Sequence, residues 1–468
     1  MADTDQCVVS RCRHERGHIT DSRFHGDSYA TAESRQIFCD TCRMQRWLDI
    51  EVVLAASQAD IGVIPADVAE EIGRAADIGR IDLDRLRDEF RATRHSLVPL
   101  LRAFAELCPD GTGDFVHFGA TTQDVQDTAQ VLEMRDVCDL VDRDLRGVLA
   151  RLRTLAVDHR DTVMIGRTHA RPALPTTFGL KVAAWIDELC RHVERLSAMR
   201  RRVLVAELHG GVGTMAGFQG HGMELLRAFA ARLGLGVPTV AWHTTRDRVA
   251  EFVTTLAMLV ATLARIADEI RTLGRPEFGE VEEGWQHGQV GSSTMPHKRN
   301  PEACEQVVVL ARLARTCATL GLEAMIDEHE RDSRALRLEW PAVADVSHHA
   351  LAALDVLCRV LDGLHVHAER MALHVRQAAG ELCSEALMLT LASRVGKQHA
   401  YRLVYDLSQA AQDNGESLDS CAARCEEVLD HLHEAELATI FDPTCQLGEA
   451  ATLVDAAVAA LDRTVGER

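Results

Sequence analysis

Tyrosine and proline are scarce in this chain, and so are the sequence patterns that build large β-sheets. The 468 residues include only 3 tyrosines and 11 prolines, and aromatic residues make up 4% of the total. Runs in which β-branched residues alternate with polar ones are also rare. Because such runs are the main signal for half-buried strands, the composition argues against a sheet protein.

Several sequence signals of cofactors and membranes are missing as well. The chain has no glycine-rich dinucleotide fingerprint and no phosphate-binding P-loop. It has no run of 18 or more apolar residues, so the sequence predicts no membrane-spanning helix. The stretch MADTDQCVVSRCRHERGH at the start is polar, which predicts no secretory signal. We therefore expect a cytoplasmic protein without a cofactor.

Positive charge is scarce relative to negative charge. The chain has 51 Lys and Arg against 71 Asp and Glu, for a formal net charge of -20. An acidic surface repels phosphate backbones, so nucleic acid is not an expected partner. A cluster of cations in such a chain is a local exception, and it predicts an anion-binding site.

The 14 cysteines are scattered, and many fall inside helical patterns, which is typical of free thiols in a reducing compartment. Cys39 and Cys42 have CxxC spacing, with Cys7 and Cys12 upstream. A structural zinc site normally needs a second matching pair, and none follows. The surrounding IFCDTCRMQRWLDIE reads as one helix. The sequence predicts no metal, and a metal-binding module built on these cysteines is the alternative.

Helical periodicity dominates the chain. In residues 248–273, apolar residues recur at steps of three and four, which places one wide apolar stripe on a helix. The segments 125–157, 176–206, 302–325 and 341–365 have the same pattern. Long striped helices joined by short links predict an all-α bundle.

The chain is too long for one ordinary core, which predicts more than one domain. Stretches rich in glycine and proline interrupt the helical pattern at 108–122, 164–175, 209–221 and 284–301. We expect an N-terminal helical domain over 1–110, a central long-helix domain over 111–360 and a C-terminal helical domain over 361–468.

Three of these interruptions carry dense polar chemistry: HFGATTQDVQD (117–127), GRTHARP (166–172) and GSSTMPHKRNP (291–301). Taken alone, the first is explained as a helix N-cap, and His169 in the second as a structural histidine. The third resists such a reading, because Lys298 and Arg299 directly follow His297 and the neighbouring serines gain nothing from packing. The set therefore indicates a chemical site.

A small dicarboxylate substrate fits all three segments. Carboxylates bind to lysine, asparagine, threonine and backbone amides. Removal of a proton next to a carboxylate builds extra negative charge, which aimed cations and amides must stabilise. A serine acts as the base when neighbouring amides and a lysine stabilise its alkoxide. A glycine-flanked loop can close and expel water, and a histidine can protonate the leaving group. The pattern indicates an acid–base enzyme without a cofactor.

The segment GSSTMPHKRNP resembles the signature loop of the fumarase/aspartase superfamily, which includes adenylosuccinate lyase, argininosuccinate lyase and 3-carboxy-cis,cis-muconate cycloisomerase. HFGATTQDVQDTA and GRTHARPALPTTFGLKVAAW resemble the first two sequence blocks of that superfamily, and GVGTMAGF and WHTTRDRVAEF also match. The resemblance implies an almost all-α protomer of three domains and a homotetramer with a twenty-helix core. It also implies active sites that each take three blocks from three different subunits.

The resemblance implies anti β-elimination from a substituted succinate, usually with release of fumarate. By position, Ser292 matches the base, Lys298 and Asn300 match the groups that hold the reacting carboxylate, and His169 matches the general acid of adenylosuccinate lyases. The remaining residues implied to bind substrate are Thr121, Thr122, Gln123, Thr168, Arg246, Ser293, Thr294 and Met295.

Departures from the family patterns narrow the substrate. Adenylosuccinate lyases grip a nucleotide phosphate with an Arg-Tyr pair near the N-terminus and an ERDxSxSxxxR segment. The stretch DSRFHGDSYATAESRQIF lacks that pair, and ERDSRALRLEW (330–340) lacks the second serine and the final arginine. Because each lost charge-assisted hydrogen bond is worth about 1.5–3 kcal/mol, an AMP-containing substrate is disfavoured.

The ER…EW ending of ERDSRALRLEW resembles the cycloisomerase branch, and so does WHTTRDRVAEF. Bacterial members of that branch usually lack the histidine that this chain keeps at His169. The combination predicts a small nitrogen-substituted succinate, of the nitrosuccinate or N-substituted aspartate type. The alternatives are a 3-carboxy-cis,cis-muconate cycloisomerase, an adenylosuccinate lyase and a catalytically inactive structural relative. Intact Ser292, Lys298 and Asn300 argue against the last of these.

Overall fold

The computed structural model describes residues 17–466, and this part of the chain is mainly helical, as predicted. The α-helices, in chain order, are α1 (Ala32–Phe38), α2 (Asp40–Asp60), α3 (Ala66–Ala75), α4 (Leu83–Thr93), α5 (Val98–Leu107), α6 (Thr122–Asp158), α7 (Phe178–Val203), α8 (Gly222–Leu233), α9 (Asp247–Leu273), α10 (Glu302–Glu323), α11 (Ser333–Asp362), α12 (Ala368–Gln377), α13 (Ala379–Leu382), α14 (Ser384–Val395), α15 (Lys397–Asn414), α16 (Leu418–Ala422), α17 (Glu426–Leu429), α18 (Glu434–Ile440) and α19 (Ala450–Gly466). The 3₁₀ turns are η1 (Ile19–Asp21), η2 (Gly26–Ser28), η3 (Ile78–Arg80), η4 (Thr112–Phe115), η5 (Ala216–Phe218) and η6 (Pro443–Gln446).

The chain divides into two compact units, each built from three segments. Unit 1 comprises the residues up to Asp144, Val193–Ala264 and Gln306–Val356. Unit 2 comprises Leu145–His192, Arg265–Glu305 and the residues from Leu357 onward. The boundaries fall inside the long helices α6, α7, α9, α10 and α11, so residues of each of these helices belong to both units.

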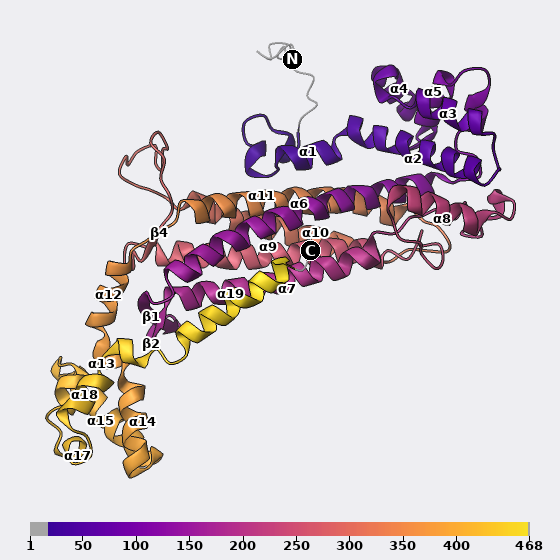
Figure 1. Ribbon diagram of the computed structural model, residues 1–468. Coiled ribbons are helices and arrows are strands. Elements are labelled where there is room, and N and C mark those ends of the chain that lie inside the picture. The colour runs from indigo at the N-terminus through magenta and orange to yellow at the C-terminus, as the bar shows by residue number, and fades with distance from the viewer. Residues whose placement is uncertain (1–16, 467–468) are drawn as a thin grey trace. The chain divides into compact units, whose positions relative to one another are not determined.

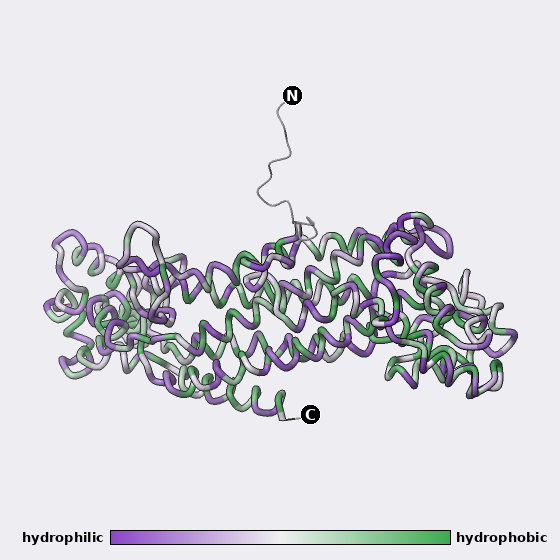
Figure 2. Tube along the Cα trace, turned by 90° about the horizontal axis from the view of Figure 1, so that it is seen from above, coloured by the Kyte–Doolittle hydropathy of each residue, from purple (hydrophilic) through white to green (hydrophobic). Residues whose placement is uncertain are grey.

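Helix α9 shows why the long helices form. Its predicted span, 248–273, agrees with the observed Asp247–Leu273, and stripe residues such as Phe252 and Leu256 are fully buried. By length and composition α9 is also apolar enough to cross a membrane, but 72% of its most apolar window is buried inside the protein, as in the core helix of a bundle. Figure 2 shows hydrophobic and hydrophilic residues interspersed along the helical segments.

Two short antiparallel pairs of strands depart from the purely helical expectation. In unit 2, β1 (Val163–Thr168) pairs with β2 (Arg171–Thr177), and β3 (Val281–Glu282) pairs with β4 (His365–Val366). Two prolines in β2 concealed the first hairpin in the sequence. A two-stranded hairpin tolerates them because each strand has an open edge that needs no amide donor.

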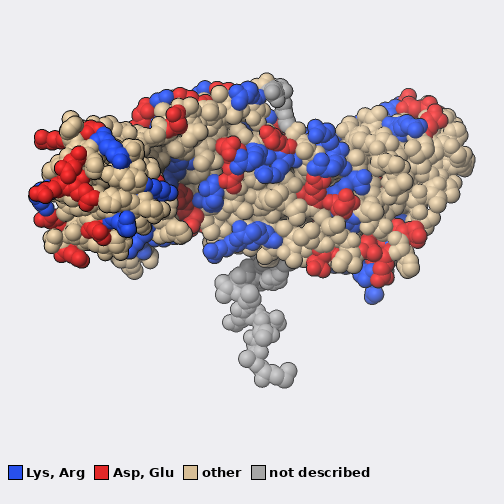
Figure 3. All heavy atoms as spheres, turned by 90° about the horizontal axis from the view of Figure 1, so that it is seen from below, with Lys and Arg blue, Asp and Glu red and all other residues tan. Residues whose placement is uncertain are grey.

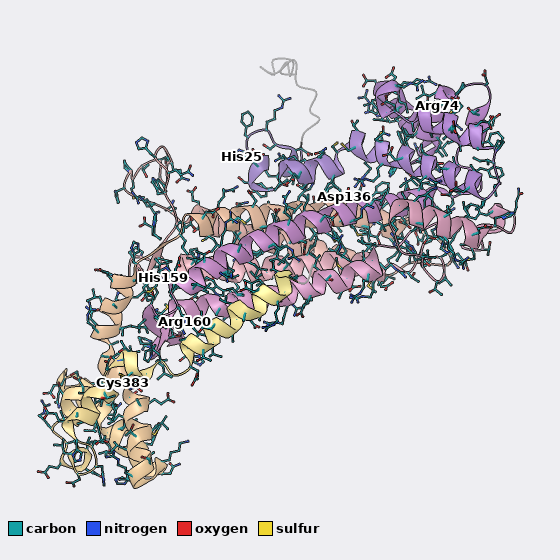
Figure 4. All side chains as sticks on the ribbon, in the orientation of Figure 1. His25, Arg74, Asp136, His159, Arg160 and Cys383 are labelled. Carbon is teal, nitrogen blue, oxygen red and sulfur yellow. The ribbon has the colours of Figure 1, made fainter. Side chains whose placement is uncertain are left out.

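The β1–β2 hairpin rests on the C-terminal helices of unit 2 (Figure 1). Ile165 of β1, Val375 of α12 and Leu382 of α13 form one buried apolar cluster. Helices α14 and α15 pack against each other beyond this cluster, and Cys383, labelled in Figure 4, is buried at the start of α14. The hairpin is therefore seated on a packed apolar base rather than free in solvent.

The helix predicted across IFCDTCRMQRWLDIE is interrupted at Cys39. This residue ends α1 and has an extended backbone, and its Sγ accepts a hydrogen bond (3.4 Å) from the backbone amide of Cys42 in the first turn of α2. The thiol takes the place of the usual N-cap oxygen. Cys39 and Cys42 are free thiols, while Cys7 and Cys12 lie outside the described residues.

Surface charge of both signs is interspersed on the face displayed in Figure 3. One ion pair in unit 2 joins Arg160, which follows α6 and is labelled in Figure 4, to Asp455 of α19 through two hydrogen bonds of 2.8 Å. In unit 1, Arg46 of α2 pairs at 2.7 Å with Asp136 of α6. Each pair joins segments that lie far apart in the sequence, although exposed pairs contribute little stability.

Candidate active site

The first predicted block forms the N-terminus of α6 in unit 1. Thr121 is the residue before the helix, and its backbone amide donates to Asp124 Oδ2 at 2.9 Å. The side chains of Thr121 and Thr122 are half-buried, whereas Gln123 is buried and donates to the His243 carbonyl and to Asp127 Oδ2, both at 3.0 Å. A helix N-terminus carries free amides and partial positive charge, which attract a carboxylate.

Asp124 organises the backbone around this helix start. Its Oδ1 accepts hydrogen bonds from the amide of His209 (2.9 Å) and from His243 Nε2 (3.1 Å). Its Oδ2 accepts from the amide of Gly210 at 3.0 Å as well as from Thr121. One buried carboxylate thereby fixes the glycine-rich turn at 209–213 against the start of α6.

Glu207 extends the same buried network. Its Oε2 accepts from the amide of Trp242 at 2.7 Å, and its Oε1 accepts from His209 Nδ1. Burial raises the pKa of the Glu207 carboxyl, and hydrogen bonds offset this only in part. Burial lowers the pKa of His243, but its bond to Asp124 and the nearby carboxylates outweigh burial and raise it overall. In this buried network at the N-terminus of α6, hydrogen bonds between carboxylates and histidines partly compensate the cost of burying their charges.

His117, at the start of the first block, is anchored to α2. Its Nδ1 lies 2.7 Å from Oε1 of the buried Glu51, and its backbone is left-handed (φ +64°). Burial lowers the pKa of His117, but Glu51 outweighs burial and the net pKa is raised. A left-handed backbone is costly for a residue other than glycine, so the Glu51 bond is part of what holds this turn.

Arg246 lies at the centre of a buried ion-pair network. Its guanidinium forms two hydrogen bonds with Asp127 (2.8 and 2.9 Å), and its Nε donates to Glu339 at 2.7 Å. All three side chains are inaccessible to solvent. The pKa of Arg246 is raised because the two carboxylates outweigh the effect of burial. The predicted contact between Arg246 and a substrate stays a prediction.

A second arginine, Arg331, lies at the α6 N-terminus, and the sequence reasoning missed it. Its Nη1 contacts Thr121 Oγ1, and the side chain is exposed. The sequence signal for it is the ERD triplet at 330–332, whose family pattern indicates a phosphate site rather than a carboxylate site. Arg331 adds an exposed cation to the helix N-terminus, where a carboxylate is favoured.

The second predicted block is the turn of the β1–β2 hairpin in unit 2. Thr168 ends β1, and His169 and Ala170 form the two-residue turn, with φ of +50° and +62°. All three residues are exposed. A two-residue turn with two left-handed residues matches the twist of a hairpin and is normally made by Asn-Gly or Gly-Gly. This turn instead presents an imidazole and a hydroxyl to solvent.

The third block is the loop at 284–301 of unit 2, which projects beside β4 (Figure 1). Ser292 Oγ accepts hydrogen bonds from the backbone amides of Thr294 (3.3 Å) and Met295 (3.0 Å). Gly291 is required at the base of the loop, because a Cβ there would clash with the carbonyl oxygen of Lys298. The Ser292 oxygen therefore faces two aimed donors, as an alkoxide would need.

The stem of the loop is tied down, while its tip is exposed. Asn300 Nδ2 donates to the Gly291 carbonyl at 2.6 Å, and Arg299 pairs with Glu282 of β3 at 3.0 Å. Lys298 is exposed. Within the loop, Ser293, Thr294 and Met295, which are predicted to bind substrate, are exposed as well.

A cavity of about 940 Å³ adjoins the loop stem within unit 2, and its lining includes Trp285, Gln289, Arg299, Asn300 and His365. Side chains of the stem therefore face open space on one side rather than a filled core. The exposed tip of the loop, by contrast, has little packing to oppose its movement, and such loops can close over a substrate.

The structure distributes the predicted residues between the two units. Thr121, Thr122, Gln123 and Arg246 lie in unit 1. The unit 2 residues are Thr168, His169, Ser292, Ser293, Thr294, Met295, Lys298 and Asn300.

One group of side chains in the described part of the chain has the composition of a metal site. Ligand atoms of Asp124, Glu207 and His243 all lie within 4.8 Å of one another. Each oxygen of the two carboxylates already accepts a hydrogen bond from the protein. These bonds account for the buried charges without an ion, and the expectation of no metal stays a prediction.

Comparison with protein families supports the sequence motifs. A family model described as lyase matches residues 27–315, and a model described as adenylosuccinate lyase C-terminus matches residues 380–457. The first match covers more than half of the chain and contains all three blocks.

Individual relatives match over almost the whole chain. An N-acetyl-S-(2-succino)cysteine lyase of Dickeya dadantii is 37% identical over 447 residues, which cover 96% of this chain and 98% of that protein. An adenylosuccinate lyase of Methanothermobacter thermautotrophicus is 37% identical over 434 residues, with 91% and 96% coverage. The crystal structure of a fumarate lyase from Mesorhizobium sp. BNC1 aligns with a TM-score of 0.86 and 35% identity, over 94% of this chain and 99% of that one.

Proposed function

The chain belongs to the fumarase/aspartase superfamily of lyases, and we propose that it eliminates a small leaving group from a substituted succinate to give fumarate. The observation that carries this proposal is the position of Ser292 Oγ under two backbone amides, at the start of a cationic loop. A serine alkoxide held by amides is a base suited to removing a proton next to a carboxylate.

The remaining groups divide the work of binding and proton transfer. The α6 N-terminus, with Thr121, Thr122 and Gln123, binds one carboxylate. Lys298 and Asn300 stabilise the carboxylate that gains charge when the proton leaves. Ser293, Thr294 and Met295 of the loop, and Thr168 of the hairpin, contact the substrate. His169, next to Thr168, protonates the leaving group where that group needs a proton.

In this scheme the buried Arg246 is proposed to act indirectly, by holding the start of α6 in place. Arg246 donates to Asp127, and Asp127 Oδ2 also accepts a hydrogen bond from the side-chain amide of Gln123, so the buried ion pairs are connected to the first turn of α6. Arg331 is the exposed arginine of the same region and is proposed as a direct carboxylate ligand. In this scheme Arg246 supports the site structurally, and Arg331 binds the substrate.

A small thiol is the leaving group that we favour. The relative from Dickeya dadantii is an N-acetyl-S-(2-succino)cysteine lyase, and the similarity covers 96% of this chain and 98% of that protein. In the reaction, Ser292 takes the C–H proton, the C–S bond breaks, and the sulfur leaves with its electron pair. A thiol has a pKa of about 8.5, so it departs as a thiolate, takes up a proton afterwards and depends little on His169.

A nitrogen leaving group is the second candidate, and His169 is the observation that favours it. The imidazole stands exposed at the hairpin tip, with no carboxylate partner among the described contacts. An amine is a poor leaving group unless it is protonated, so N-substituted aspartates would use this residue. Nitrosuccinate, which releases the weak base nitrite, would not.

We propose a homotetramer in which each site takes its three blocks from three subunits. The test is complementation. Variants Ser292→Ala and His169→Gln are each purified, then mixed, unfolded and refolded together, and assayed on an N-substituted aspartate, the substrate class that needs His169. Because some mixed sites receive both intact blocks, activity should return above that of either variant alone. A mixture no more active than its parents would count against shared sites.

The substrate is tested with a panel assayed for fumarate by ultraviolet absorbance. The panel contains N-acetyl-S-(2-succino)cysteine, N-substituted aspartates, nitrosuccinate, adenylosuccinate and 3-carboxymuconate. We expect the thiol compound to give the highest kcat/KM. Fumarate from a nitrogen compound alone would change the leaving group but keep the elimination. Consumption of carboxymuconate alone would overturn the elimination.

A further inference from the structure

Glu280 is a buried carboxylate at a junction of unit 2, between the end of α9 and strand β3. Its side chain is fully buried. The two oxygens accept hydrogen bonds from both terminal nitrogens of Arg167 (2.8 and 3.0 Å), and Oε1 also accepts from His374 Nδ1 of α12 at 2.8 Å. The carboxylate therefore connects the hairpin to the C-terminal helices.

The backbone of Glu280 is tied on both sides as well. Its amide donates to the carbonyl of Leu273 at the end of α9 (3.0 Å), and its carbonyl accepts from the amide of His367 before α12 (3.0 Å). Two residues later, Glu282 of β3 pairs with Arg299 in the stem of the loop. Glu280 thus lies in a segment whose position is fixed by three neighbours.

Arg167, the partner of Glu280, lies two residues before the hairpin turn. Its guanidinium lies 4.6 Å from the ring centroid of Phe278, and its side chain is 17% exposed. The pairing of β1 with β2 shifts register between Gly166 and Arg167, so the backbone ladder is irregular at the position where the turn begins. The side chain of Arg167 supplies a restraint there that the ladder lacks.

The turn itself needs that restraint. His169 and Ala170 both have left-handed backbones, which residues other than glycine adopt at a cost. Such a conformation persists only where contacts with the surrounding structure hold it in place. The apolar contacts of Ile165 hold the middle of β1, and the Arg167–Glu280 pair holds its end.

We infer that Glu280 is a positioning residue for the elimination: through Arg167, its buried carboxylate fixes the turn that presents Thr168 and His169. The inference rests on the proposed roles of those two residues. Glu280 itself is buried beneath the turn and has no exposed surface for a substrate.

The charge of Glu280 supports this role. Burial raises the pKa of its carboxyl, but hydrogen bonds from Arg167 and His374 outweigh burial and lower it overall. The carboxylate is therefore charged at neutral pH, and a neutral replacement leaves the Arg167 guanidinium without its counter-ion. Glu280→Gln keeps the size of the side chain and removes the charge.

The chain offers a matched control in unit 1. Glu133 of α6 is also buried, with its side chain 2% exposed, and it receives two hydrogen bonds of 2.8 and 3.0 Å from Arg43 of α2. Glu133→Gln therefore breaks an equivalent arginine–carboxylate pair that touches neither the hairpin nor the loop. Any effect shared by both variants reflects general loss of stability.

The first readout is hydrogen exchange of the amides at 163–177 in the whole protein. We expect Glu280→Gln to speed exchange at the turn by about tenfold or more, and Glu133→Gln to leave it unchanged, because local opening depends on local contacts. Equal exchange at the turn in both variants would overturn the inference. If Glu280→Gln does not fold, Arg167→Lys, which keeps the charge but loses the paired geometry, takes its place under the same criterion.

The second readout is a double-mutant cycle on an N-substituted aspartate, the substrate class that needs a proton from His169, with His169→Gln as the partner change. Glu280→Gln should lower kcat by about 10–100-fold with little change in KM, and should add less than about threefold in the His169→Gln background, because coupled residues are not additive. Independent losses would contradict the inference. A fully active His169→Gln would refute the proposed role of His169, while hydrogen exchange would still decide the role of Glu280.

Discussion

Ser292 Oγ lies 3.0 Å from the backbone nitrogen of Met295 and accepts its hydrogen bond. Together with the Thr294 amide, this contact aims two fixed donors at the one hydroxyl that the superfamily pattern assigns to proton abstraction. Amides that are already oriented stabilise a developing alkoxide without the cost of reorganisation. In this loop of small hydroxyls and cations, the Ser292 oxygen therefore already faces two fixed hydrogen-bond donors.

The first prediction concerns the two adjacent serines. Ser292→Ala should lower kcat by about 10²–10⁴-fold, the range lost with a catalytic base. Ser293 is exposed, so Ser293→Ala, the matched control, should keep kcat within about tenfold, well short of the loss of a base. Thermal unfolding should be the same for both, because neither hydroxyl lies in a core. If Ser293→Ala is the inactive variant, the base has been assigned to the wrong serine.

The second prediction concerns Arg246, whose guanidinium is fully buried between Asp127 and Glu339. Arg246→Met leaves two buried carboxylates without their cation, which should cost about 3–5 kcal/mol of unfolding free energy. Arg248 is the control, because it is half-buried and donates only to the carbonyl of Arg202. Denaturant unfolding of both variants measures the difference. Equal stability of Arg246→Met and Arg248→Met would show that the buried network contributes little.

The third prediction concerns acid stability and Asp124. Burial raises the pKa of this carboxyl, but hydrogen bonds from His243, Thr121 and His209 lower it below its ordinary value. A carboxyl with a depressed folded pKa contributes stability that is present above its unfolded pKa, about 3.9, and lost as pH falls through the folded pKa. The unfolding free energy should therefore decline as pH drops below about 4.

Asp124→Asn tests this assignment. The variant should be less stable at neutral pH and should lose less stability on acidification, because it has no charge to lose there. Chemical unfolding at a series of pH values gives both quantities. If the unfolding free energy of the variant fell with decreasing pH as steeply as that of the parent protein, Asp124 would be excluded as a main source of the acid dependence.

The fourth prediction concerns metal ions. The Asp124, Glu207 and His243 group has the composition of a metal site, but hydrogen bonds already occupy its carboxylate oxygens. Activity should therefore survive prolonged dialysis against a strong chelator, and elemental analysis should find less than about one bound ion per several chains, since a resident metal would be stoichiometric. Loss of activity that added metal restores would contradict this.

The long helices were the most predictable part of the fold. The apolar stripe of α9 fixed its span to within one residue, from 248 against the observed Asp247. The apolar stripe predicted a helix over 341–365, yet α11 begins at Ser333 and continues through Pro341 to Asp362. The division into domains at about 110 and 360 stays a prediction.

The buried network beneath α6 was beyond the reach of sequence patterns. Asp124 bonds to His209 and His243, which lie 85 and 119 positions away along the chain. No periodicity connects such positions, since only the packing of several helices brings them together. The same limit applies to Arg246, whose RDR context resembled a substrate site but whose partners come from α6 and α11.

The most direct test of the central claim is a paired measurement with N-acetyl-S-(2-succino)cysteine. Fumarate is followed by its ultraviolet absorbance while free thiol is titrated in the same reaction, for the parent protein and for Ser292→Ala. The account predicts equal molar amounts of fumarate and thiol from the parent protein and almost none from the variant. Thiol without fumarate, or undiminished turnover by Ser292→Ala, would contradict an elimination driven by this serine.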